Sequence, residues 1–86
     1  MQEFIDSLDL PIKGEMRNNE YIIDIKDSDD FSTLYNAISL NKKLNMLDNS
    51  LANIHESKFS FTDGTYQVNL EADYDNDIYK LVVENR

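Results

Sequence analysis

The stretch Tyr66-Gln-Val-Asn-Leu-Glu-Ala-Asp-Tyr74 alternates apolar and polar residues without a break. Its even positions carry tyrosine, valine, leucine, alanine and tyrosine, and its odd positions carry glutamine, asparagine, glutamate and aspartate. Successive side chains of a β-strand point to opposite faces of a sheet. The stretch therefore predicts a strand with one face in a hydrophobic core and the other lined by polar and acidic side chains.

Turn signals on both sides of this strand predict a three-stranded antiparallel meander. Asp63-Gly64 is a dipeptide that accepts the positive φ angles of a tight hairpin turn, and it joins a strand over Lys58–Thr62 to the next over Thr65–Ala72. A second turn, Asp73–Asp77, leads into a third strand over Ile78–Glu84.

The N-terminal third of the chain predicts a short helix followed by a hairpin. Apolar residues of Met1–Leu10 recur at helical spacing until Pro11, which ends the helix or turn. The segments Ile12–Met16 and Glu20–Lys26 flank a polar turn, and the second of them is rich in β-branched residues. We expect these two segments to pair as strands.

The main helix is predicted from Ser28 to near Asn41. Ser28 is a suitable N-cap, and the acidic residues that follow it favour the positive end of the helix dipole. The apolar side chains lie three and four residues apart on one stripe: Phe31, Leu34, Tyr35 and Ile38. Residues 42–56 contain many asparagines and aspartates, and we expect a short helical turn and an irregular stretch there.

The order hairpin, helix, meander predicts an α+β fold, with a small antiparallel sheet of about five strands and one main helix packed on one face. A chain of 86 residues forms one domain, because it cannot supply two hydrophobic cores. No apolar run reaches the length of a membrane span, no basic and apolar leader precedes the domain, and cysteine is absent. We therefore expect a cytoplasmic protein.

The charge of the chain restricts its partners. Seventeen acidic residues against eight basic ones give a formal net charge of −9, which repels nucleic acid and anionic lipid and attracts basic surfaces. Large basic surfaces are typical of proteins that bind nucleic acid. We expect a basic protein partner and no direct binding to nucleic acid or membrane.

Two acidic runs supply the candidate partner-binding residues. Between Phe59 and Tyr79 there are five acidic residues and no lysine or arginine, and the run from Glu20 to Asp30 is relieved only by Lys26. Surface solubility explains an ordinary charge run, but like charges crowded in one loop cost stability that solubility does not demand. A tyrosine within the run adds an aromatic anchor suited to an arginine-rich partner. The predicted binding residues are Asp24, Asp27, Asp29, Asp30, Asp63, Glu71, Asp73, Tyr74, Asp75 and Asp77.

Metal-binding and catalytic functions fit the sequence less well. The series Asp73, Asp75, Asp77 and Glu84 matches the first, third, fifth and twelfth positions of a calcium-binding EF-hand loop. Ile78 occupies the sixth position, where that loop needs glycine, and the flanking segments read as strands. His55 is the only histidine, and no glycine-rich phosphate loop is present. We expect no metal, no cofactor and no enzymatic activity.

In size, charge and predicted architecture the chain resembles the short acidic proteins with which bacteriophages disable host defences, including anti-CRISPR proteins and inhibitors of DNA-repair enzymes. The resemblance implies that the protein occupies a cationic nucleic-acid channel as a decoy, with carboxylates in place of phosphates. Two alternatives are an immunity protein or antitoxin against a basic nuclease, and a structural or adaptor protein that assembles through a sheet edge.

Overall fold

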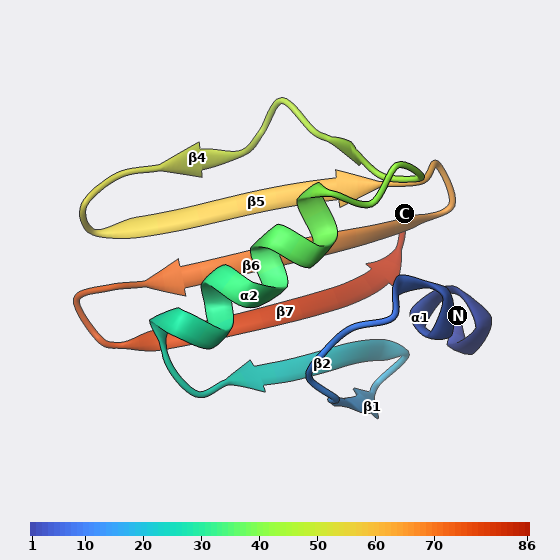
Figure 1. Cartoon of the computed structure of the whole chain (residues 1–86), viewed down its shortest axis with the longest axis horizontal. Coiled ribbons are helices and arrows are strands. Elements are labelled where there is room, and N and C mark those ends of the chain that lie inside the picture. Colours follow the sequence, from blue (N-terminus) through green and yellow to red (C-terminus); the bar gives the residue numbers. More distant parts are fainter.

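The computed structural model describes all 86 residues and forms one open antiparallel sheet of seven strands, with two helices (Figure 1). The sheet order is β1-β2-β7-β6-β5-β3, and β4 also pairs with β5. The α+β prediction is confirmed, including the sequence of hairpin, helix and meander. The elements are α1 (Gln2–Leu8), β1 (Glu15–Arg17), β2 (Glu20–Ile25), α2 (Ser28–Ser39), β3 (Asn45–Met46), β4 (Leu51–Ala52), β5 (Glu56–Thr62), β6 (Tyr66–Asp73) and β7 (Ile78–Asn85).

The core lies between α2 and one face of the sheet. The even-numbered residues of β6 from Val68 to Ala72 are buried there, as the alternation predicts, and Leu34 and Ile38 of α2 are buried against the sheet. Tyr79 also lies in this core, with its ring centroid 5.8 Å from that of Phe31. α2 therefore crosses the central strands and leaves the other face of the sheet uncovered by any helix (Figure 1).

The cap of α2 differs from the sequence prediction by one residue. Asp27 is the N-cap, because its backbone is extended and its Oδ1 accepts a 2.9 Å hydrogen bond from the Asp30 N–H. Ser28 is already the first helical residue. An aspartate in this position satisfies a free backbone donor and adds a negative charge at the positive end of the helix dipole.

Replacing Asp27 with alanine should therefore cost about 1 kcal/mol of unfolding free energy, the usual cost of a lost N-cap. Ser32→Ala, an exposed substitution within the same helix, should change the unfolding free energy by less than about 0.5 kcal/mol. Urea unfolding of the two variants compares them directly. Equal values would show that Asp27 does not cap the helix.

Residues 42–56 form turns and two short strands, where the sequence predicts a short helical turn and an irregular stretch. The Leu44 N–H donates to the Asn41 carbonyl, which forms a single turn, and the two-residue strands β3 and β4 then pair with β5. Leu44, Leu47, Leu51 and Ile54 are spaced three and four residues apart, as on one face of a helix, but only Leu44 is buried. The asparagines and aspartates between these leucines favour turns over helix interiors.

The first strand is also displaced from its predicted position, and begins at Glu15 instead of Ile12. Ile12 packs against the core, and Gly14 passes so close to β2 that a Cβ there would lie 2.1 Å from the Ile22 carbonyl oxygen. The turn consists of Asn18 and Asn19, both with positive φ. Neither helix has the length and apolar composition needed to cross a membrane.

Candidate functional site

Three connections meet at one end of the sheet, at the left of Figure 1: the β2–α2 loop, the β4–β5 loop and the β6–β7 turn. The Tyr74 N–H donates to the His55 carbonyl at 2.9 Å, and His55 Nδ1 lies 3.0 Å from Asp75 Oδ2, so the last two are joined directly. We call this region the acidic end and define it by seven residues: Asp27, Asp29, Asp30, Glu56, Asp73, Asp75 and Asp77.

The acidic end gathers a large share of the acidic residues. Seven of the seventeen lie here, and Lys26 is the one lysine or arginine in the three connections. Lys58 and Lys80 lie two residues into β5 and β7 and line one cleft with Glu56 and Asp73. The fold thus brings parts of the two predicted acidic runs to the same end of the sheet.

The predicted carboxylate ladder along β6 does not form a negative face. Glu71 lies between two lysines on neighbouring strands, with Lys80 Nζ at 3.3 Å and Lys58 Nζ at 3.9 Å from its carboxylate oxygens. Asp24, on the same face, accepts a 2.7 Å bond from Arg17 Nη2. Both predicted binding residues are therefore paired with cations on neighbouring strands, a placement that depends on the strand register.

A hydrogen-bonded network occupies the middle of this same uncovered face. Asn69 Oδ1 accepts from Ser60 Oγ at 2.8 Å and from Gln67 Nε2 at 2.9 Å, and Asn69 Nδ2 donates to Glu84 Oε1 at 3.0 Å. Ser60 and Asn69 are buried. The odd-numbered face of β6, predicted to be polar and acidic, is therefore a surface whose polar groups are hydrogen-bonded or ion-paired to one another.

Asp63 lies in the β5–β6 turn, at the opposite end of β6 from Asp73, and is not part of the acidic end. Its Oδ1 accepts 2.9 Å hydrogen bonds from the backbone N–H groups of Tyr66 and Thr65. These two bonds, that of Tyr66 first, lower the pKa of the Asp63 carboxyl below its usual value. The role of Asp63 is to fix the hairpin turn.

The lowered pKa of Asp63 makes the stability of the fold depend on pH. Because the pKa of Asp63 is lower in the folded state, its ionised form stabilises the fold above the unfolded value of about 4, and this contribution is lost as the pH falls through the folded pKa. The exposed position limits the effect to about 1 kcal/mol. Urea unfolding of wild type and Asp63→Asn should differ at pH 6 and converge towards pH 2; a constant difference would contradict this assignment.

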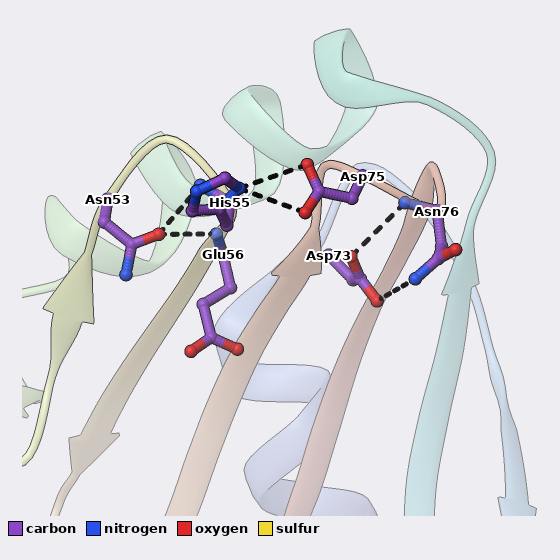
Figure 2. A network of polar contacts seen from close by, with 6 residues as sticks. All are labelled: Asn53, His55, Glu56, Asp73, Asp75 and Asn76. Carbon is purple, nitrogen blue, oxygen red and sulfur yellow. Dashed lines mark hydrogen bonds and ion pairs between the residues drawn. The ribbon is translucent and has the colours of Figure 1, made fainter.

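Several carboxylates of the acidic end also have local structural roles. Asp73 accepts hydrogen bonds from the Asn76 backbone N–H at 3.3 Å and from Asn76 Nδ2 at 2.8 Å, which close the β6–β7 turn (Figure 2). Asp77 follows with a φ of 54°. Glu56 has no side-chain partner, and its carboxylate points away from the other labelled side chains (Figure 2). Glu56 therefore has no structural role of this kind, and Asp75 has only its exposed contact with His55.

Exposed apolar side chains accompany these charges. Ile54 is 83% exposed in the β4–β5 loop, Ile78 is 57% exposed at the start of β7, and Tyr74 is 38% exposed in the turn. Tyr74 is held by a 2.9 Å hydrogen bond between its hydroxyl and Ser57 Oγ and by an edge contact with Tyr79. The sequence predicts Tyr74 as an anchor but neither isoleucine, because nothing in the sequence shows that these two apolar side chains stay exposed.

The calcium-like spacing is not reproduced in space. Asp73 pairs with Ile78 at one end of the β6–β7 hairpin, whereas Glu84 pairs with Gln67 towards the other end. Nowhere in the structure do three acidic or histidine side chains come together in a group that could hold a metal ion. Comparisons with models of protein families, with characterised proteins and with solved structures found no match to this chain.

Proposed function

We propose that the protein binds, through its acidic end, a basic surface of a nucleic-acid-binding protein and thereby inhibits it. One observation carries the proposal: seven of the seventeen acidic side chains lie at one end of the sheet, together with the exposed side chains of Ile54, Tyr74 and Ile78. The function is binding and requires no catalytic group.

The mixture of charge and apolar surface favours a binding site over a face that only maintains solubility. Carboxylates from three separate segments lie at this end, and their mutual repulsion opposes the stabilising hydrogen bonds that Asp27 and Asp73 accept. Ile54 and Ile78 add exposed apolar side chains at the same end of the sheet. Protein interfaces use this combination, with a few apolar or aromatic anchors for affinity and surrounding charges for steering and partner choice.

The arrangement also supports a partner that normally holds nucleic acid. Basic surfaces that bind nucleic acid are arranged to hold several phosphates at once. Carboxylates from α2, from β5 and from the β6–β7 turn would meet such a surface from one end of the sheet. A basic nuclease neutralised by an immunity protein would be recognised through the same electrostatics.

Assembly through a sheet edge has less support. The outer strands are short, with three residues in β1 and two each in β3 and β4, and therefore offer few free backbone groups to a pairing strand. Edge pairing would also leave the charge at the acidic end without a role.

Capture from an extract of the producing cell tests the proposal. The tagged protein should retain a basic, nucleic-acid-binding protein at about 50 mM salt and lose most of it at about 300 mM, because affinity that depends on many charges falls steeply with ionic strength. Capture of partners with no basic surface, or capture unaffected by salt, would contradict the proposal.

A further inference from the structure

A cleft of about 280 Å³ lies at the end of the sheet opposite the acidic end. It is enclosed by α1, by the α2–β3 connection and by the β5–β6 turn, at the right of Figure 1. Its apolar wall consists of Phe4, Leu8, Leu44 and Tyr66. The volume of the cleft is just below the roughly 300 Å³ at which binding sites for drug-sized ligands begin. The cleft therefore suits a single side chain.

The polar groups around this cleft carry a net negative charge. Glu3 and Asp63 contribute two carboxylates and Lys43 contributes one ammonium group. No ion pair engages any of the three. Asp63 Oδ2 is free, because both turn hydrogen bonds go to Oδ1, and the lowered pKa keeps this carboxyl ionised. The cleft therefore combines unpaired negative charge with an apolar wall.

Two aromatic rings form part of that wall. The centroids of Phe4 and Tyr66 are 4.8 Å apart with an interplanar angle of 30°, and both side chains are partly exposed. Aromatic faces attract cations, and the attraction is greatest for a flat cation that stacks on the ring. Guanidinium is flat, pairs with carboxylates through two parallel hydrogen bonds and is weakly hydrated, whereas ammonium is a strongly hydrated point charge.

We propose that this cleft binds an arginine side chain of another molecule. The methylene stem packs on Leu8 and Leu44, and the guanidinium lies against the aromatic pair within reach of Glu3 and Asp63. This site is separate from the acidic end, so the inference does not depend on the proposed function.

Titration with Nα-acetyl-arginine amide, followed by NMR, tests the proposal without a partner. Saturable shifts should appear at Phe4, Leu44 and Tyr66 with millimolar affinity. The citrulline analogue, which has the same stem without the charge, should bind at least fivefold more weakly, and the lysine analogue should fall between the two. Citrulline binding as tight as arginine, or shifts at the acidic end alone, would overturn the proposal.

Variants sharpen the test because two of them should weaken arginine binding and a third should strengthen it. Glu3→Gln and Phe4→Leu should each weaken arginine binding about threefold, and Lys43→Ala should strengthen it about twofold, since the competing cation is removed. The matched control is Asp77→Asn, which removes the same charge at the acidic end and retains a residue type that tolerates positive φ. If Asp77→Asn weakened binding as much as Glu3→Gln, general attraction by the net charge would explain the result and the cleft site would be wrong.

Discussion

The double variant Glu56→Lys/Asp75→Lys should bind the basic partner at least ~30-fold more weakly than wild type at physiological salt. Each reversal replaces an attraction with a repulsion. Two reversals at the edge of an interface lower the binding free energy by roughly 2 kcal/mol. Quantitative capture, or titration of the purified partner, measures the change. The fold should be retained, because neither carboxylate caps a helix or closes a turn.

The choice of these two positions follows from the structure. Glu56 pairs across the sheet with Asp73, so a lysine there replaces a like-charge pair with an opposite-charge pair. Asp75 is exposed and loses only its contact with His55. Asp27 and Asp73 are poorer choices, because each accepts hydrogen bonds that fix the local backbone.

A matched control separates the position of the charge from its amount. Asp6→Lys/Asp48→Lys changes the net charge equally at two exposed positions outside the acidic end. It should weaken partner binding less than about threefold. An equal loss in both double variants would show that net charge alone attracts the partner and that the acidic end is not the binding surface.

Leu34→Ala should lower the unfolding free energy by about 3 kcal/mol, within the range of about 2–5 kcal/mol measured for buried leucines. Leu34 is fully buried on the stripe of α2 that faces the sheet, so its truncation leaves a cavity between the layers. That loss is a large part of the roughly 5–15 kcal/mol that holds a small domain together. Urea unfolding at constant m-value provides the measurement.

Leu40→Ala is the matched control, because Leu40 caps the C-terminus of the same helix and is 79% exposed. The same chemical change should cost less than about 0.5 kcal/mol there. If the two substitutions had equal effects, α2 would not pack on the sheet through the stripe that contains Leu34.

Sequence patterns predicted the parts of the fold in which the conformational preference of a segment agrees with its packing in the whole domain. The alternation from Tyr66 to Tyr74 marks the buried face of β6, and the apolar stripe of α2 marks its contact with the sheet. The leucines after Asn41 had helical spacing, but the residues between them favour turns, and pairing with β5 determined their conformation.

The site was only partly predictable, because electrostatic compensation occurs across strands. Glu71 and Asp24 belong to acidic runs in sequence, yet the register places cations beside them. Asp63 belongs to the same run as Asp73 but lies at the far end of the hairpin. The aspartates around the start of α2 and those of the β6–β7 turn do lie at the same end of the sheet, and Glu56 lies there at the start of β5, which no local pattern indicated.

The central claim is that the acidic end occupies a surface which the partner otherwise uses for nucleic acid. The most direct measurement is whether the captured partner holds its nucleic acid and this protein at the same time, at constant ionic strength. Nucleic acid should displace the wild-type protein completely, with no ternary complex, because both require the same cationic surface. A stable ternary complex with undiminished affinity for both would contradict the account.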